Sequence, residues 1–251
     1  MNRSLFCYAL AAVLLIQTTV TAHEGDKQPA TAIGNNSLQL IANKGQLTDQ
    51  DGQLRRDIDA KAEHNGVTMF VGNGQLHYQW IRSESQKSCE GIPLGKVKSP
   101  KSGAKGVSSL TPEEGRSEVS IYRMDVTLVG ANKNAEVVFE APTGYYENYY
   151  LAYTGNDGVK ANGYSKMTYK NVYPNIDWVF YTSPDEQKGL KYDFIIHPGG
   201  NPADIRLRYD GATELKLEKG ALVAITPYGS ITEDAPYSYL QDSRKQVASA
   251  Y

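Results

Sequence analysis

A period of two in the placement of apolar residues, repeated along most of the 251-residue chain, limits the possible folds more than any other feature. It is clearest at residues 57–81, where two Asn-Gly steps, Asn65-Gly66 and Asn73-Gly74, separate three alternating runs. Successive side chains of a strand point to opposite faces, and Asn-Gly favours the type I′ turn of a two-residue hairpin. The segment therefore predicts a three-stranded meander. Nine of its residues are predicted to share one face, namely Ile58, Ala60, Ala62, Val67, Met69, Val71, Leu76, Tyr78 and Trp80.

The second half of the chain repeats this alternation. Apolar residues alternate with polar ones in 118–130, 189–197 and 204–211, and three short runs are joined at Lys219-Gly220 and Tyr228-Gly229. No amphipathic stretch of helical period is longer than about two turns. Strands at intervals of roughly 8–12 residues predict an all-β class, and specifically an antiparallel β-sandwich of two packed sheets with many short hairpin-connected strands.

The N-terminal residues 1–22 have the pattern of a secretory signal peptide. Arg3 precedes an apolar run at 5–16, and small residues end at Ala22, directly before His23. The apolar run is too short to span a bilayer as a mature anchor. The sequence thus predicts a secreted protein, extracellular or at the cell surface, with no membrane span after signal cleavage; an uncleaved anchor is the alternative.

The rest of the chain is predicted to be a polar tether at 23–36 and a β-sandwich domain at 37–251 with a flexible insertion at 83–118. The insertion is rich in Ser, Gly and Lys and has almost no apolar periodicity. Its lysines favour a solvated loop, with contact to an anionic glycan as the alternative. It also contains Cys89, the single cysteine left after cleavage, which predicts a surface thiol and no internal disulfide.

Motifs for catalysis are weak. His197 shares a strand face with Asp193, but residues four apart in a strand are roughly 13 Å apart, so a histidine capping a strand end is the favoured interpretation. Ser102 and Lys105 fit the loose pattern S-x-x-K within the insertion, and no G-x-S-x-G occurs. No catalytic residue is therefore predicted. A formal net charge of −2 argues against a nucleic-acid partner.

Two oxygen-rich turns are candidate sites for structural calcium. One contains Asp49 and Asp51, and the other contains Asn156, Asp157 and Asn162. Neither fits the EF-hand loop, and ordinary Asx-turn hydrogen bonding accounts for both. No metal site and no cofactor are predicted otherwise, and none of the four histidines has a metal-ligand spacing.

Tyrosine is unusually frequent, with 18 Tyr against 5 Phe, and residues 144–158 read GYYENYYLAYTGNDG. In a strand, Tyr145 and Tyr149 would share one face with Leu151 and Tyr153, whereas Tyr146 and Tyr150 would share the other. One face is expected to pack in the core. For Tyr146 and Tyr150, packing in the core or against a neighbouring domain is favoured, and a carbohydrate platform is the alternative.

Several strings together resemble a known family. They are LQLIANKGQ (38–46), NVYPNIDWVFY (171–181), GLKYDFIIHPGGNPADIRLRYDGA (189–212) and TPYGSITEDAPYSY (226–239). Over about residues 38–247 the chain is similar to the N-terminal domain of large secreted bacterial proteins that carry SBBP-type β-propeller repeats, often with a C-terminal sorting or gliding-motility-type domain. That domain has no assigned activity, so the resemblance implies an architecture and a location.

The chain departs from the family pattern in two ways. The 83–118 segment is longer than the usual connection. The family domain also continues into further strands and repeats, whereas this chain ends at Tyr251. The expectation is a truncated front end whose sheet edge near 236–251 lacks a partner; a natural short version is the alternative.

Three functions follow from these observations. The leading hypothesis is a secreted non-catalytic β-domain that supports cell-surface adhesion or packs against extracellular repeats, with a surface glycan or downstream β-propeller repeats as partner. The second is a carbohydrate-binding module that uses Tyr146 and Tyr150. The third is a secreted glycan or peptide hydrolase whose carboxylates the sequence does not pair.

Overall fold

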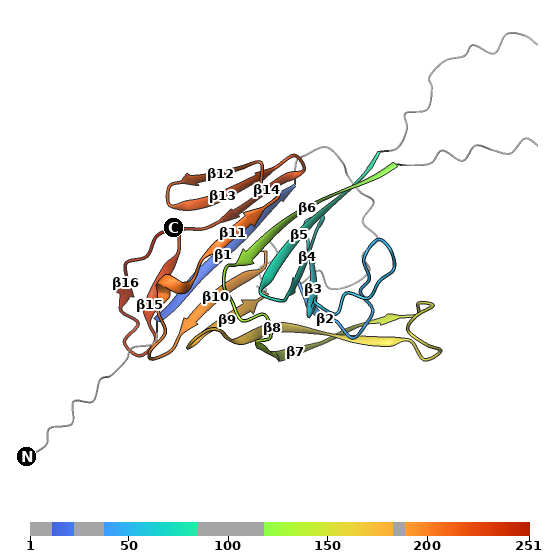
Figure 1. Ribbon diagram of the computed structural model, residues 1–251, viewed down its shortest axis with the longest axis horizontal. Coiled ribbons are helices and arrows are strands. Elements are labelled where there is room, and N and C mark those ends of the chain that lie inside the picture. The colour runs from blue at the N-terminus through green and yellow to red at the C-terminus, as the bar shows by residue number, and fades with distance from the viewer. Residues whose placement is uncertain (1–11, 23–37, 85–117, 183–188) are drawn as a thin grey trace, which may run out of the picture. The chain divides into compact units, whose positions relative to one another are not determined.

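The computed structural model describes residues 12–22, 38–84, 118–182 and 189–251 (Figure 1). The chain divides into two compact units, one made of residues 1–80 and 122–251 and the other of residues 81–121. The predicted tether lies outside the described residues, as does the predicted insertion apart from its end residues. Cys89 and the pair Ser102 and Lys105 lie there as well.

The described residues form strands and one short 3-10 helix, so the predicted all-β class is confirmed. The strands are β1 (Ala12–Ala22), β2 (Leu40–Ala42), β3 (Ala60–His64), β4 (Val67–Gly72), β5 (Gln75–Glu84), β6 (Glu118–Leu128), β7 (Glu136–Tyr149), β8 (Val159–Tyr173), β9 (Ile176–Tyr181), β10 (Lys191–Ile196), β11 (Leu207–Asp210), β12 (Glu214–Glu218), β13 (Ala221–Thr226), β14 (Gly229–Glu233), β15 (Tyr237–Leu240) and β16 (Gln246–Val247), and the 3-10 helix η1 spans Pro202–Asp204.

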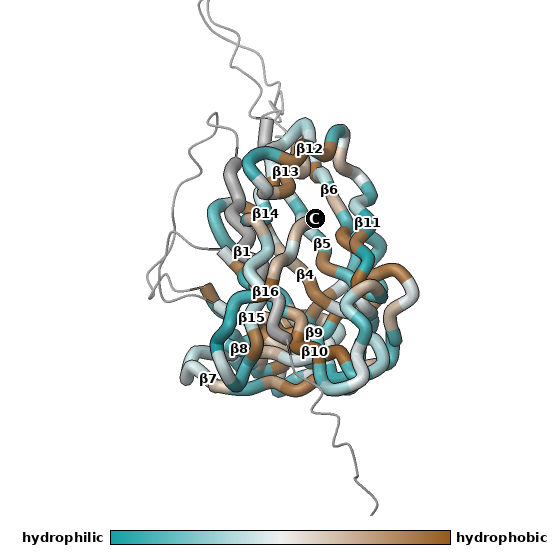
Figure 2. The backbone as a smooth tube through the Cα atoms, turned by 90° about the vertical axis from the view of Figure 1, so that its left-hand side faces the viewer, coloured by the Kyte–Doolittle hydropathy of each residue, from teal (hydrophilic) through white to brown (hydrophobic). Residues whose placement is uncertain are grey.

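Hydrogen bonding joins these strands in the order β11-β6-β5-β4-β3-β2-β8-β9-β10-β1-β14-β13-β12. β7 pairs with β8, and β15 pairs with β1 and β16. The large antiparallel sheet is curled (Figure 2). Its curl brings Tyr122 of β6 against Tyr228 of the β13–β14 turn, with ring centroids 5.3 Å apart. The finer expectation, a sandwich of two packed sheets, stays a prediction.

The predicted meander is confirmed as β3, β4 and β5. Asn65 and Gly66 have φ values of 49° and 74°, and Asn73 and Gly74 have 52° and 70°. Both pairs thus occupy the left-handed region that a type I′ turn requires, which Asn and Gly enter most easily. The register His64↔Val67 and Gly72↔Gln75 closes each hairpin directly at its turn.

The core contains the residues that the alternation places on one shared face of the meander. Trp178 of β9 is buried at its centre, stacked on Phe194 with ring centroids 6.1 Å apart and tilted against Phe180 at 4.4 Å. Aromatic pairs of this kind stabilise a core beyond the area they bury. Part of the tyrosine content is also core. The buried positions include all nine of the predicted meander face and Met124, Val126, Leu128, Tyr169, Tyr173, Leu190, Tyr192, Phe194 and Ile196.

Strand β1 is a feature that the sequence did not predict. It comprises residues 12–22, the segment assigned above to the signal peptide, and lies among β10, β14 and β15. Its first half pairs with β10 from Ala12↔Ile196 to Gln17↔Lys191, and its second half pairs with β14. The apolar, β-branched composition that suits a leader also suits a strand. Signal peptide function stays a prediction.

Candidate functional site

Exposed tyrosines gather on the hairpin formed by β7 and β8. β8 pairs with β2 at Gly163 and Tyr164 and with β9 from Lys166 onward, whereas its earlier residues pair with β7 alone. The distal part of the hairpin, 146–162, is therefore a two-stranded ribbon. Figure 1 shows that it extends past β2 and β3.

A shift of register gives the ribbon its own direction. The pairing of β7 with β8 shifts between Pro142 and Tyr146. Ala141 and Gly144 both have positive φ there, 51° and 80°. The Thr143 hydroxyl donates to the Gly163 carbonyl at 3.1 Å and fixes the irregular segment. A bulge of this kind bends the strand and increases its twist, so the distal ribbon leaves the main sheet.

One face of the ribbon carries an aromatic ring among amide and ammonium groups. Tyr146 lies opposite Asn162, and Asn148 lies opposite Lys160, so the four side chains share a face. All four are exposed, and Tyr146 is 48% exposed. Lys160 Nζ lies 3.8 Å from the centroid of the Tyr146 ring, and this cation–π contact holds the ring over the ribbon.

Tyr150 follows directly after β7 and is 75% exposed. Its ring lies against the backbone of Gly158, where an added Cβ would stand 2.8 Å from Tyr150 Cδ1 and 2.7 Å from the Tyr149 carbonyl oxygen. Only glycine fits this approach, and its φ of +68° is also unfavourable for other residues. We call Tyr146, Asn148, Tyr150, Lys160 and Asn162 the hairpin surface.

The other face of the ribbon is a polar network. Tyr145 and Tyr149 both donate hydrogen bonds to Glu147, which also forms an ion pair with Lys61 of β3 at 3.6 Å. Partial burial, followed by the Glu147 hydrogen bond, raises the pKa of Tyr149 to about 12. At the tip, the Tyr153 hydroxyl donates to the Gln46 carbonyl at 2.9 Å. These contacts fix the hairpin against the loop after β2.

The expectation that one face of residues 144–158 packs in the core is therefore wrong, because Tyr145, Tyr146 and Tyr150 are exposed and Tyr149 is half-buried. Packing of Tyr146 and Tyr150 against a neighbouring domain stays a prediction. The predicted alternation of faces holds for Tyr145, Tyr146 and Tyr149, which lie in β7. It ends with that strand, and Tyr150 and Tyr153 lie in the following loop. The physical reason is that the ribbon has two strands, and among the described residues no other strand continues along it. Its tyrosines are held by polar contacts instead.

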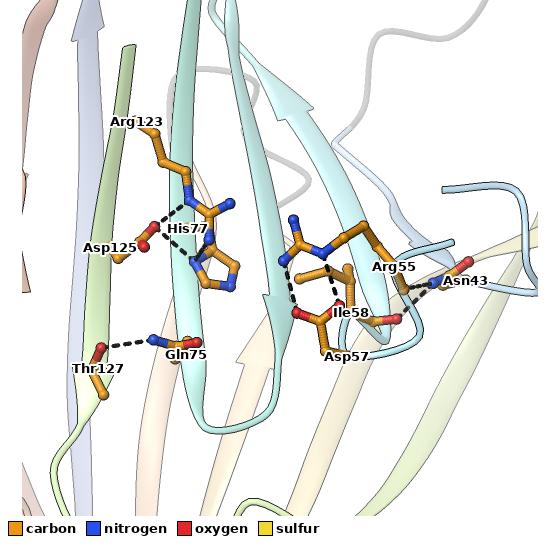
Figure 3. Close-up of polar contacts among 9 residues, drawn as sticks. All are labelled: Asn43, Arg55, Asp57, Ile58, Gln75, His77, Arg123, Asp125 and Thr127. Carbon is orange, nitrogen blue, oxygen red and sulfur yellow. Dashed lines mark hydrogen bonds and ion pairs between the residues drawn. The ribbon is translucent and has the colours of Figure 1, made fainter. Parts of the chain in front are cut away.

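A second polar cluster lies on β5 and β6 (Figure 3). His77 is 1% exposed, and its Nδ1 lies 2.8 Å from Asp125 Oδ1. Arg123 Nε donates to the same oxygen at 2.6 Å. Burial on its own raises the pKa of Asp125, but the bonds from His77 and Arg123 outweigh it and hold this pKa below its ordinary value. No signal in the sequence indicates this pair, because His77 and Asp125 are 48 positions apart.

Beside this cluster, Arg55 donates two hydrogen bonds to Asp57, at 2.8 and 2.7 Å (Figure 3). Asn43 Nδ2 donates to the carbonyls of Arg55 and Ile58, which closes the loop. A pocket of about 200 Å³ opens here. It holds Asp59, which accepts a hydrogen bond from Tyr169 and whose pKa is raised by burial. The pocket is lined by Asn43, Gly45, Leu47, Leu54, Arg55, Arg56, Ile58 and Asp59.

The hydrogen-bond partner of His197 is Asp177 of β9. Nε2 of His197 lies 2.9 Å from Asp177 Oδ2, and Lys170 Nζ lies 2.9 Å from the same oxygen. Asp193 lies on β10, as predicted, but His197 follows directly after the end of that strand, and Asp177 is the carboxylate within its reach. The hairpin β9–β10 explains this, because Ile195 lies opposite Asp177 and His197 is two residues further on. The arrangement resembles strand-end capping, as expected for His197.

A glutamate is buried inside the curled sheet. Glu233 of β14 is 0% exposed, and its Oε2 accepts hydrogen bonds from Tyr192 at 2.9 Å and Tyr251 at 3.2 Å. Burial raises the pKa of Glu233 above its ordinary value, although the phenol bonds act in the opposite direction. The group therefore links β10, β14 and the last residue of the chain.

The first of the two oxygen-rich turns is an Asx turn. Asp49 Oδ1 accepts hydrogen bonds from the backbone N–H groups of Asp51 and Gln53, at 2.9 and 2.8 Å. Within the described ranges, no group of three His, Cys, Asp or Glu residues is arranged to hold a metal ion. Within the same ranges, no helix has the length and hydropathy of a membrane span.

Comparison with known proteins gives one match. A family model described as a domain of unknown function, DUF7948, matches residues 40–251. No curated protein matches the chain, and no solved structure matches it. The match covers most of the chain, and it brings no activity, ligand or partner with it.

Proposed function

We propose that this chain, which belongs to the DUF7948 family of domains of unknown function, is a non-catalytic binding domain of a secreted protein. The hairpin surface is its contact site, and a polysaccharide of the cell surface or its surroundings is the ligand. The observation that supports the proposal is the exposure of Tyr146 and Tyr150, at 48% and 75%, on a ribbon that projects from the sheet.

The chemistry of the hairpin surface suits a sugar. An exposed phenol ring offers an apolar face to the C–H groups of a pyranose and a hydroxyl at its edge. Asn148 and Asn162 supply amide donors and acceptors beside Tyr146, and Lys160 supplies an ammonium donor. Because Lys160 covers one side of the Tyr146 ring, it also adds positive charge where an acidic sugar would lie.

Packing against extracellular repeats is the second candidate. Leu151 and Tyr153 at the tip of the hairpin are 38% and 45% exposed, which adds apolar area next to the hairpin surface. The propeller repeats and gliding-motility context of the resemblance supply the partner for this candidate and stay predictions. The secreted location belongs to both candidates and is supported by the leader pattern of residues 1–22.

The carboxylates give no support to a hydrolase. Glycoside hydrolysis needs two carboxyl groups that face each other across a cleft. Asp125, Asp177 and Asp57 each accept hydrogen bonds from a cation, and their pKa values are held below the ordinary value. Such groups are ion-pair partners: Asp57 pairs with Arg55 within one loop, Asp125 with Arg123 within β6, and Asp177 of β9 with Lys170 of β8.

The proposal is tested by binding to a panel of neutral and acidic polysaccharides in affinity electrophoresis. Tyr146→Ala and Tyr150→Ala should each weaken binding roughly tenfold, the equivalent of about 1.4 kcal/mol. Thermal unfolding should change little, because both rings are exposed. Tyr237→Ala is the matched control, since Tyr237 is 45% exposed on β15 and should leave binding unchanged. Equal binding by the wild type and the double hairpin variant would exclude the hairpin surface as the contact site.

A further inference from the structure

The position of β1 in the sheet conflicts with the fate predicted for the same residues. Cleavage after Ala22 would remove the whole of Ala12–Ala22, which is β1. Among the described strands, β1 alone is hydrogen-bonded both to β10 of the large sheet and to β14 and β15. Without it, no ladder of backbone hydrogen bonds joins β12–β16 to the other strands of the described part of the chain.

The hydrogen bonds left open would lie next to the core. β10 pairs with β1 along its whole length, Lys191–Ile196, and β14 along its whole length, Gly229–Glu233. Tyr192, Phe194, Ile231 and Glu233 on these two strands are all buried. Backbone N–H and C=O groups buried without partners are strongly unfavourable, and an open strand edge is a template for another strand.

The sequence of β1 indicates which kind of strand fits between β10 and β14. Residues 12–22 read AVLLIQTTVTA, eleven residues without a charge and rich in apolar and β-branched types. They run antiparallel to β10, β14 and β15 in one extended stretch. Strand addition of this kind takes its affinity from main-chain hydrogen bonds and its specificity from alternate side chains.

We propose that the processed domain, residues 23–251, binds an extended strand of a partner polypeptide in the place that β1 occupies. The strand is about eleven residues long, as β1 is, and uncharged, and it runs antiparallel to β10. This site is separate from the hairpin surface and does not depend on the glycan proposal. We call it the β1 slot, bounded by β10 (Lys191–Ile196), β14 (Gly229–Glu233) and β15 (Tyr237–Leu240).

The test begins with the full chain secreted by a bacterial host and purified. Intact mass gives its N-terminus, and hydrogen exchange measures protection of the amides in 191–196 and 229–233. The probe is a fluorescent synthetic peptide of residues 12–22 with a lysine tail for solubility, and fluorescence anisotropy measures its binding. The expected result is a chain that begins at His23, binds the peptide, and gains amide protection in β10 and β14 when it does.

Two peptide variants test the register. Position 14 lies opposite Phe194, which is fully buried, so Leu14→Asp places a charge opposite a buried ring of β10. Its binding should be weaker by about tenfold or more, because an unpaired charge is costly to bury. Position 17 lies opposite Lys191, so Gln17→Asp carries the same charge to a tolerant position and should bind within about threefold of the parent.

Each remaining outcome decides the proposal. A purified chain that keeps residues 12–22 overturns it, because β1 is then a permanent strand. A processed chain whose β10 and β14 amides are protected without peptide also overturns it, whether the slot has closed or a second copy fills it. If the processed chain lacks the near-ultraviolet dichroism of a packed core, recovery of that signal on peptide addition supports the proposal, and no recovery overturns it.

Discussion

At the scale of single residues, Asp177 shows how a buried carboxylate holds an irregular strand. The pairing of β8 with β9 shifts between Tyr169 and Tyr173, and Asn171 has a φ of 52° there. Asp177 Oδ1 accepts a hydrogen bond from the Asn171 backbone N–H at 2.8 Å, while Oδ2 lies 2.9 Å from both Lys170 and His197. The carboxylate thus satisfies a backbone group that the bulge leaves unpaired.

The change Asp177→Asn should lower the free energy of unfolding by about 1–3 kcal/mol near neutral pH, because it weakens hydrogen bonds to a buried charged group. Burial raises the pKa of Asp177, but the bonds from His197, Asn171 and Lys170 outweigh it, so the pKa is lowered in the folded state. The stability contributed is therefore present above the unfolded pKa and lost as the pH falls through the folded one.

Urea unfolding between pH 2 and pH 7 measures both effects. The wild type should lose more stability than Asp177→Asn as the pH falls below about 4. Asp210→Asn is the control, because Asp210 pairs with Arg208 on the surface, with side chains 52% and 60% exposed. Such pairs contribute roughly 0–1 kcal/mol. If the free energy of unfolding falls equally steeply with decreasing pH in the wild type and in Asp177→Asn, the pKa of Asp177 is not lowered in the folded state.

At the scale of elements, the β7–β8 hairpin depends on its glycines. Gly158 and Gly155 have similar φ values, +68° and +76°, so alanine at either position has a similar backbone strain. The two positions differ in the free space around an added Cβ atom. A Cβ on Gly158 would meet the Tyr149 carbonyl oxygen and the Tyr150 ring, whereas a Cβ on Gly155 would meet nothing within 4 Å.

Gly158→Ala should therefore move Tyr150 and the tip of the hairpin, and Gly155→Ala should not. We expect Gly158→Ala to reduce polysaccharide binding several-fold and to cost roughly 1 kcal/mol more stability than Gly155→Ala, in proportion to the additional clash. Affinity electrophoresis and urea unfolding measure the two quantities. The same loss of binding in both variants would mean that backbone strain, and not the contact with Tyr150, controls the surface.

Elements made by local contacts could be predicted from the sequence. The β3–β4–β5 meander followed from alternation and two Asn-Gly steps, because both turns join neighbouring strands. The end of β7 at Tyr149 could not be predicted from the sequence, since tyrosine is common in strands and in exposed loops alike. Strand β1 was assigned to a leader because an apolar run of that length carries no signal for pairing with residues about 180 positions later.

At the scale of the whole molecule, the polar pairs of the candidate sites could not be predicted from the sequence. His77 and Asp125 are 48 residues apart, and His197 and Asp177 are 20 residues apart. Their contact depends on which strands are neighbours, and several orders of strands fit one alternation pattern. The exposure of Tyr146 and Tyr150 was equally hidden, because it follows from the absence of a third strand beside the described ribbon.

The core depends on one aromatic cluster that joins three strands. Trp178 of β9 contacts Tyr169 of β8 and Tyr192 and Phe194 of β10, with ring centroids between 5.8 and 6.1 Å away. It is 1% exposed. These strands lie in the middle of the strand order, so loss of the ring removes packing on both sides of β9.

Trp178→Ala should lower the free energy of unfolding by about 3–5 kcal/mol, whereas Trp178→Phe should cost less because a ring remains to stack on Phe194. Urea unfolding followed by circular dichroism measures the loss. Tyr237→Ala, which removes an exposed ring tilted against that of Tyr239, should stay within about 1 kcal/mol of the wild type. If Trp178→Ala were as stable as Tyr237→Ala, backbone hydrogen bonds would hold β8, β9 and β10 together. The aromatic cluster would then contribute little to the free energy of unfolding.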